Sequence, residues 1–203
     1  MDSFIALPEE KQETVIGAAL AAFGRNGYKK ASTADVALAA GISKGMVFHY
    51  FGTKKGLYIF LCEHCRKAMG EALSLNGKEA DFFARIRQST ALKVELLKKK
   101  PHMLEFLKSM YQETDPEVAL EVEGFRELIA PAQQALLIED EDRAKFKDGV
   151  DPEQVLKMLT WMGVGASEEM SGASDEKMNE LLASFDKCIE IIKNNFYKKE
   201  EYL

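Results

Sequence analysis

The chain has 203 residues, 46% of them hydrophobic and 30% charged, a balance typical of globular proteins with room for one or two domains. It contains no run of about 18 apolar residues, so we expect no membrane-spanning helix. Its start lacks the basic and then apolar profile of a signal peptide, and its three cysteines are too few for a disulfide framework. We therefore expect a cytoplasmic protein.

The net charge of −6 is distributed unevenly along the chain. Residues 25–55 contain six basic residues and one acidic residue, whereas residues 56–203 contain 20 basic and 28 acidic residues. A basic segment attached to an acidic remainder directs one end of a protein toward a polyanion. The distribution of charge therefore argues for nucleic-acid binding, although the net charge argues against it.

The first elements are expected to be a short arm over residues 1–8 and a helix over residues 9–25 that ends by Gly27. Pro8 and the two glutamates after it suit the positively polarised start of this helix. The apolar residues recur at the spacing of a core-facing helix, and they are Val15, Ile16, Ala19, Leu20 and Phe23.

Residues 32–51 contain two short helical patterns separated by Gly41. Glycine readily takes the left-handed conformation that a tight exit from the first helix requires. Ser43 is expected to cap the second helix, residues 44–51, and Ile42 to fill the angle between the two helices. Two helices joined by a short turn that contains glycine describe a helix-turn-helix.

Every later segment also predicts helix, and no strand is convincing. The predicted helices cover residues 54–75, residues 79–100, a segment that starts at Pro101, residues 115–138 with a kink at Pro131, residues 151–170 and residues 174–197, and a charged connector covers residues 139–149. The sequence therefore predicts an all-α protein of nine helices.

Two stretches carry a resemblance to a known family. T-A-D-V-A-L-A-A-G-I-S-K-G, residues 33–45, and V-F-H-Y-F-G-T-K-K-G-L-Y, residues 47–58, resemble the DNA-binding signature of TetR (tetracycline repressor-like) transcriptional regulators. The likeness covers about 50 residues, from Glu10 to about Phe60. It implies a DNA-binding domain over residues 1–53, a connecting helix over residues 54–75, and a ligand-binding and dimerisation domain over residues 76–203.

The resemblance also implies a function. We expect a homodimeric repressor that a small apolar or amphipathic ligand releases from a palindromic DNA operator. A DNA-binding regulator that is controlled by a protein partner, or that activates transcription, is the alternative. Enzyme motifs such as G-x-S-x-G, H-E-x-x-H and phosphate-binding loops are absent from the sequence, so we expect no catalysis, no cofactor and no metal.

The second helix of a helix-turn-helix enters the major groove, so its exposed residues are expected to contact bases and phosphates. Lys44 can donate to guanine, Gly45 allows close backbone approach, and Met46 offers apolar contact, for instance to a thymine methyl group. Hydroxyl groups at helix starts and a lysine on the next helix are expected to hold phosphates. The predicted contact residues are Thr33, Ser43, Lys44, Gly45, Met46, Phe48, His49, Tyr50 and Lys54.

Two of these positions depart from the family pattern. Met46 stands where many members have a small polar residue, and Phe48 stands where many have tyrosine. Phe48 keeps the ring but has no hydroxyl group, so a phosphate contact there is an open alternative to packing. Val47 is expected to pack in the core.

Wide apolar arcs on the last two helices favour a two-fold dimer interface. The alternative is that the same side chains face the core of their own chain. The predicted interface residues are Val155, Leu159, Met162, Met178, Leu181, Leu182, Phe185, Ile189 and Ile192.

Phenylalanine and methionine are frequent in residues 80–170 and can line an adaptable apolar pocket, although any helical core also contains them. The predicted pocket residues are Phe83, Met103, Phe106, Met110, Phe125, Met158, Trp161 and Met162. Cys62 and Cys65 could form a metal or redox switch, but a structural role is the preferred interpretation because no further ligand pair is evident.

Overall fold

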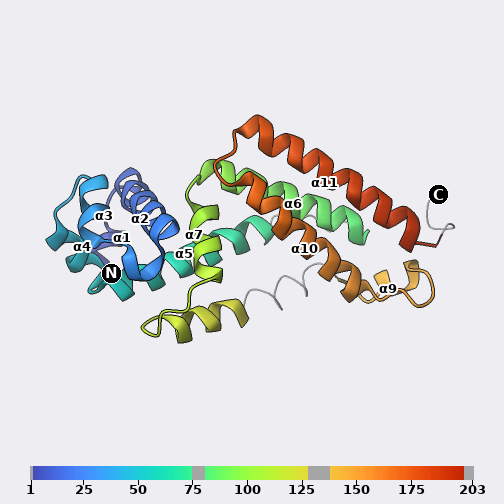
Figure 1. Cartoon of the computed structure of the whole chain (residues 1–203), viewed down its shortest axis with the longest axis horizontal. Coiled ribbons are helices and arrows are strands. Elements are labelled where there is room, and N and C mark those ends of the chain that lie inside the picture. Colours follow the sequence, from blue (N-terminus) through green and yellow to red (C-terminus); the bar gives the residue numbers. More distant parts are fainter. Residues whose placement is uncertain (1, 75–80, 128–137, 199–203) are drawn as a thin grey trace. The chain divides into compact units, whose positions relative to one another are not determined.

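The computed structural model describes residues 2–74, 81–127 and 138–198 (Figure 1). Within these ranges the chain is all-α, as predicted, with a single isolated β-bridge between Phe146 and Tyr197. Eleven helical segments are present in this part of the chain instead of the predicted nine. The two additional ones are single turns, α1 (Asp2–Ile5) and α9 (Asp142–Lys145), which lie where an arm and a charged connector were expected.

None of the helices in the described ranges has both the length and the apolarity needed to cross a membrane. The predicted kink at Pro131 lies outside the described residues.

The chain forms two compact units, each built from two separate stretches of sequence. The first unit comprises Met1–Met69 and Lys99–Leu128, and the second comprises Gly70–Lys98 and Ile129–Leu203. These units are defined by packing within the chain. The predicted division into a DNA-binding domain, a connecting helix and a ligand-binding domain, with boundaries at residues 53 and 75, concerns function and stays a prediction.

The first unit contains α1, α2 (Glu9–Lys30), α3 (Thr33–Ala39), α4 (Lys44–Phe51), most of α5 (Lys54–Ser74), α7 (Met103–Tyr111) and a helix over residues 119–127. The helix α2 packs along α7 and buries its predicted apolar stripe. It bends at Gly27, whose φ of 68° only glycine adopts readily, close to the predicted end of the helix.

The short helix α1 has a structural role, because Phe4 is fully buried. The Phe4 ring lies 4.8 Å from the Phe51 ring and 5.4 Å from the Phe60 ring, measured between centroids. The expectation of a simple arm was therefore wrong, since one aromatic side chain fixes this segment to the core.

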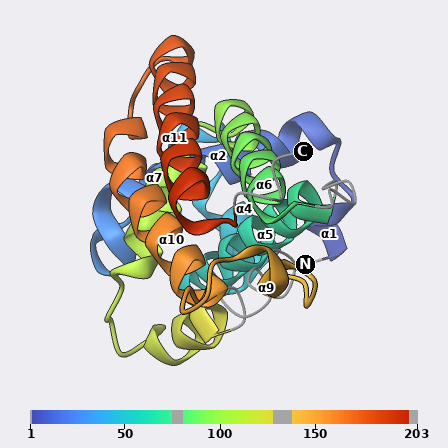
Figure 2. The ribbon, with the colours of Figure 1, turned by 90° about the vertical axis from the view of Figure 1, so that its right-hand side faces the viewer.

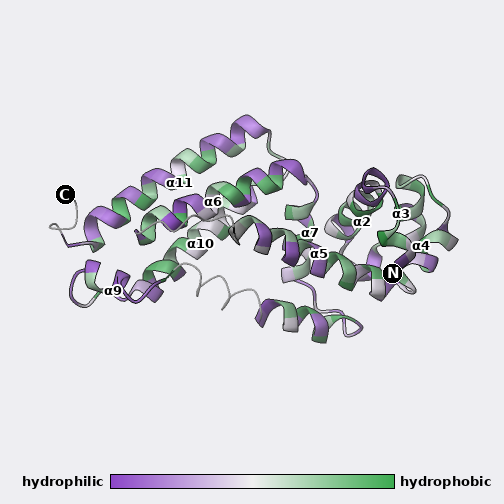
Figure 3. Ribbon diagram, turned by 180° about the vertical axis from the view of Figure 1, so that it is seen from behind, coloured by the Kyte–Doolittle hydropathy of each residue, from purple (hydrophilic) through white to green (hydrophobic). Residues whose placement is uncertain are grey.

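The second unit contains α9, α10 (Pro152–Met170), α11 (Asp175–Phe196) and all of α6 (Phe82–Lys99) except its last residue. The helix α6 lies beside α10 and α11 (Figures 1 and 2). Alternating hydrophilic and hydrophobic bands along α6 and α11 mark them as amphipathic (Figure 3). Their apolar faces meet α10 in one core, which contains Phe82, Phe83, Ile86, Phe146, Val155, Leu156, Leu159, Phe185, Ile189 and Tyr197.

The starts of α10 and α11 are where the sequence predicted them. The carboxylate of Asp151 accepts a hydrogen bond from the Glu153 backbone N–H at 3.1 Å, and Ser174 Oγ accepts one from Lys177 at 3.3 Å. The turn α9 is anchored to α6 by an ion pair between Arg85 and Asp142, both of which are buried.

Candidate nucleic-acid interface

The turn between α3 and α4 has the geometry that the glycine pattern predicts. Gly41 has a φ of 65°, and the backbone N–H of Ile42 donates to the carbonyl of Ala37 at 3.0 Å, which closes the end of α3. Ser43 caps α4, because its Oγ accepts a hydrogen bond from the Met46 backbone N–H at 3.2 Å. This capped, tightly turned pair of helices is a helix-turn-helix.

One face of α4 packs in the core and the other is exposed. Val47, Tyr50 and Phe51 are buried. The exposed residues are Ser43, Lys44, Gly45, Met46, Phe48 and His49, all of them predicted contact residues.

Tyr50 was expected to face outward, and this was wrong. Only 6% of its surface is exposed, because it lies three residues after Val47 on the same face of α4 and its ring centroid is 5.6 Å from that of Phe4. Tyr50 therefore helps to position α4.

The exposed face of α4 carries positive charge and apolar side chains and no carboxylate. Met46 is 36% exposed and Phe48 is 38% exposed. The Lys44 ammonium lies 5.9 Å from the centre of the Phe48 ring, a cation–π contact that orients this lysine along the helix. Such a surface offers a hydrogen-bond donor for guanine and apolar contact for thymine methyl groups.

The hydroxyl residues that cap the helices around the turn differ from those expected. Thr33 is buried, and the cap of α3 is the preceding Ser32, whose Oγ accepts from Ala34 at 3.2 Å and Asp35 at 3.3 Å. Thr53 Oγ1 accepts from the Gly56 backbone N–H at 2.9 Å near the start of α5. Sequence reasoning missed Ser32 and Thr53 as caps, although a hydroxyl residue directly before a helical pattern is the signal for one.

Lys54 and Lys55 have partners inside the first unit. Lys54 Nζ donates to the Lys29 carbonyl at 3.0 Å and lies 4.9 Å from the centre of the Tyr28 ring. Lys55 Nζ forms an ion pair with Glu121 at 2.5 Å, and this contact lowers the pKa of the Glu121 carboxyl. Lys54 therefore has an intramolecular role, and its phosphate contact stays a prediction.

Comparison with known proteins agrees with this geometry. Residues 15–59 match the family described as "Bacterial regulatory proteins, tetR family". The HTH-type transcriptional repressor AcnR of Corynebacterium efficiens is 26% identical over 177 residues, which cover 86% of this chain and 90% of AcnR. In the segment of residues 15–59 the chain is similar to regulators of the tetR family.

Solved structures of TetR-family regulators share the fold. A regulator from Chloroflexus aurantiacus matches with a TM-score of 0.73 at 20% identity, covering 98% of this chain and 99% of that one. The fatty acid degradation regulator FadR from Bacillus halodurans matches with a TM-score of 0.68 at 17% identity, covering 87% of this chain and 96% of that one. At these identities the likeness establishes the fold alone.

The residues predicted to line an effector pocket are divided between the two units. Met103, Phe106, Met110 and Phe125 belong to the first unit, and Phe83, Met158, Trp161 and Met162 belong to the second. The first three are buried on α7, where the ring centroids of Phe106 and Tyr58 are 5.4 Å apart. Phe83 is part of the core of the second unit.

Two of these residues do not face the interior of the chain. Met158 is 40% exposed and Trp161 is 64% exposed, because the opposite face of α10 supplies Val155, Leu156 and Leu159 to the core. Their assignment to an interior pocket was therefore wrong.

The residues predicted to form the dimer interface differ in how far their own chain buries them. Five of the nine are buried within their own chain, namely Val155, Leu159, Met178, Phe185 and Ile189. Met162, Leu181, Leu182 and Ile192 are partly buried. Four of these five, Val155, Leu159, Phe185 and Ile189, share one core with side chains of α6, which supports the alternative interpretation for them. The apolar residues that the two helices expose are instead Met158, Trp161, Val164 and Ile191.

Cys62 and Cys65 are buried on α5, and burial raises the pKa of both thiols, that of Cys65 to about 12. A thiol that stays protonated is a poor nucleophile and a poor metal ligand. No cluster of three or more potential metal-binding side chains occurs among the described residues. These observations favour the structural interpretation of the cysteine pair.

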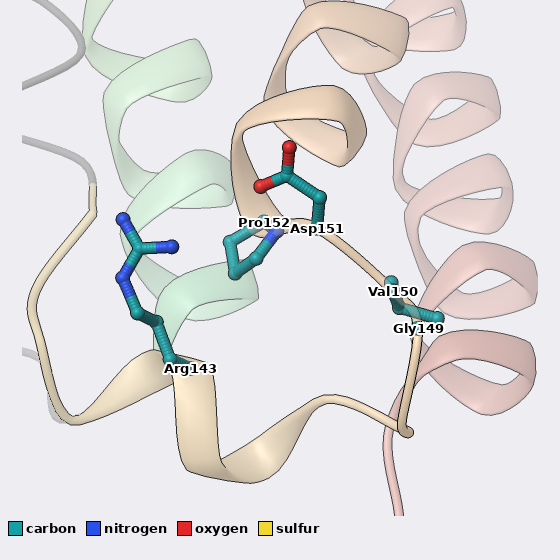
Figure 4. Close-up of a pocket in the computed structure, with 5 residues that line it drawn as sticks. All are labelled: Arg143, Gly149, Val150, Asp151 and Pro152. Carbon is teal, nitrogen blue, oxygen red and sulfur yellow. The ribbon is translucent and has the colours of Figure 1, made fainter.

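A surface depression of about 380 Å³ lies beside α9 and the start of α10 (Figure 4). It is lined by Arg143, Gly149, Val150, Asp151 and Pro152. The Arg143 guanidinium is already paired with Glu153, and this pairing holds the pKa of the Glu153 carboxyl at about 2. The depression contains none of the predicted pocket residues.

Proposed function

We propose that this protein is a homodimeric repressor of the TetR family that binds a palindromic DNA operator through α4 and is released by a small amphipathic molecule. The exposed face of α4 carries the proposal, because it combines Lys44, Met46, Phe48 and His49 and contains no carboxylate. Capping at Ser43 and the packing of Tyr50 hold this face in place. The repressor assignment draws on the relative AcnR, which is named as a transcriptional repressor.

Dimerisation is proposed because one helix-turn-helix contacts too few base pairs for useful specificity. The outer faces of α10 and α11 support it, since Trp161, Val164 and Ile191 are each at least 60% exposed. Exposed apolar side chains grouped on adjacent helices are typical of protein interfaces.

Selection of bound fragments from genomic DNA with the purified protein tests the DNA-binding proposal. We expect a palindrome whose half-sites are one helical turn apart or a multiple of it. Binding without any preferred sequence would contradict sequence-specific regulation.

Variants then test the residues of α4. Combined replacement of Lys44, Met46 and His49 by alanine is expected to weaken operator binding more than 100-fold, because base contacts contribute about 1–3 kcal/mol each. The protein should keep its circular dichroism spectrum and its oligomeric state. Lys99→Ala, at the exposed end of α6, is the matched control and should bind like the wild type.

A further inference from the structure

The core-facing side of α6 is interrupted by two polar residues. Ser89 and Lys93 lie on the same face of the helix as Phe82, Ile86 and Leu97, because these positions follow one another at intervals of three or four residues. The three apolar residues and Ser89 are buried, and Lys93 is mostly covered. A lysine in the middle of an otherwise apolar stripe is costly to keep there.

Three other cations of α6 form ion pairs, and Lys93 differs from them. Arg85 pairs with Asp142, Arg87 with Asp186 and Glu190, and Lys98 with Glu95. Within residues 2–74, 81–127 and 138–198, by contrast, Lys93 forms no hydrogen bond and no ion pair. Burial lowers the pKa of its ammonium group.

Ser89 lies one turn before Lys93 on the same face of α6. It is 2% exposed, and its Oγ atom has no hydrogen-bond partner in the described structure. A buried hydroxyl without a partner costs about 1–3 kcal/mol. Among the described residues, Ser89 and Lys93 are thus two donors on one face of α6 without an acceptor, as expected where a bound molecule supplies the acceptor.

We propose that Ser89 and Lys93 form the polar end of the effector site and that the effector is an amphipathic carboxylate. Its carboxylate accepts hydrogen bonds from the Lys93 ammonium and the Ser89 hydroxyl, and its apolar part lies against the apolar residues of the same stripe. The inference rests on the proposed function, since it names the chemical class of the molecule that would release the operator. Apolar effectors without charge would leave both donors unsatisfied.

Binding of simple probes to the full-length protein tests the inference. Straight-chain carboxylates from butanoate to dodecanoate, each compared with the alcohol of the same length and with decyl phosphate, are titrated by calorimetry. We expect at least one carboxylate to bind tenfold or more tightly than its alcohol. A carboxylate series that does not bind, alcohols that bind equally well, or decyl phosphate that binds more tightly than decanoate would overturn the assignment.

Matched variants locate the site. Lys93→Met removes the charge and keeps an unbranched side chain of similar length, and it is expected to reduce carboxylate affinity at least tenfold while leaving alcohol affinity unchanged. Ser89→Ala should give a smaller loss in the same direction. Lys99→Met, which removes an exposed lysine at the end of α6, is the control and should bind the carboxylate like the wild type. Wild-type affinity in Lys93→Met would overturn the proposal.

Operator binding measured on the same samples separates this inference from the function on which it rests. Carboxylate binding that depends on Lys93 but leaves operator affinity unchanged would support the site and contradict ligand-controlled release. Release of the operator by a neutral alcohol, equally in the wild type and in Lys93→Met, would support ligand-controlled release and overturn the carboxylate site.

Discussion

The carboxylate of Glu113 accepts a hydrogen bond from the backbone N–H of Tyr28 at 2.8 Å, one residue beyond the bend of α2 at Gly27. Its other oxygen accepts from the backbone N–H groups of Thr114 at 2.9 Å and Asp115 at 2.8 Å. One side chain thus joins the segment after α7 to the end of α2, directly before the helix-turn-helix. The DNA-binding elements are therefore held partly by residues that lie 85 positions further along the chain.

Removal of this link should destabilise the first unit. Glu113→Ala leaves a partly buried backbone N–H without its charged acceptor, so we expect the free energy of unfolding to fall by about 1–3 kcal/mol. Chemical denaturation measures the change. Glu127→Ala, at an exposed position in the same unit, is the control and should remain within about 0.5 kcal/mol of the wild type. Equal stability of the two variants would show that the link contributes nothing.

The turn of the helix-turn-helix gives a second prediction. Gly41 has a φ of 65°, which costs a residue with a side chain about 1–2 kcal/mol, so Gly41→Ala should lower stability by that amount. Gly17 lies inside α2 with open space around its Cα atom, so Gly17→Ala should raise stability by about 0.5–1 kcal/mol. Thermal unfolding of both variants measures whether each substitution raises or lowers the stability of the protein. A stabilising Gly41→Ala substitution would refute the geometry of the turn.

Lys54 allows a test of its intramolecular role. Because its ammonium donates to the Lys29 carbonyl and lies over the Tyr28 ring, Lys54→Met should cost about 1 kcal/mol of stability. The dependence of operator affinity on salt should stay unchanged, whereas loss of a phosphate contact would reduce the logarithmic slope by about 0.9. Titrations at several salt concentrations measure this slope. A reduced slope would instead support the phosphate contact that was predicted from the sequence.

The helix-turn-helix was predictable because its signals are local. Gly41 ends one helix, Ser43 caps the next, and both act within a few residues of themselves. The orientations of Tyr50 and Lys54 depend instead on Phe4 and on the end of α2, which the sequence around α4 does not reveal. Local chemistry thus predicted the motif, and contacts between distant segments decided which of its side chains face solvent.

The same limit explains the errors on α10 and α11. A wide apolar arc shows that a helix is covered on more than one side, but it does not show which part of the arc the chain itself covers. The packing of α6 decides this by burying Leu159 and Ile189 and leaving Trp161 exposed.

Trp161 is accordingly the residue with which to test the proposed dimer. A glutamate there would place a charge in the apolar centre of the interface, so Trp161→Glu should shift the protein from dimer to monomer, with at least a tenfold weaker association. Light scattering coupled to size-exclusion chromatography measures the molar mass. Leu120→Glu replaces an even more exposed apolar residue of the first unit and should leave the dimer intact. A dimer that survives Trp161→Glu would place the interface elsewhere.

The buried ammonium of Lys93 predicts a dependence of stability on pH in the absence of ligand. Its folded-state pKa is lowered from the ordinary value of 10.5, so between the folded value and 10.5 the unfolded chain holds a proton that the folded chain has released. Stability contributed by this group therefore rises with pH across that window and levels off above 10.5. Lys93→Met removes the effect, so its gain in stability over the wild type should be largest at low pH and shrink as the pH approaches 10.5. Denaturation across this range measures the difference, with Lys99→Met at the exposed end of α6 as the control. A difference that does not change with pH would mean that Lys93 is fully solvated in the folded protein.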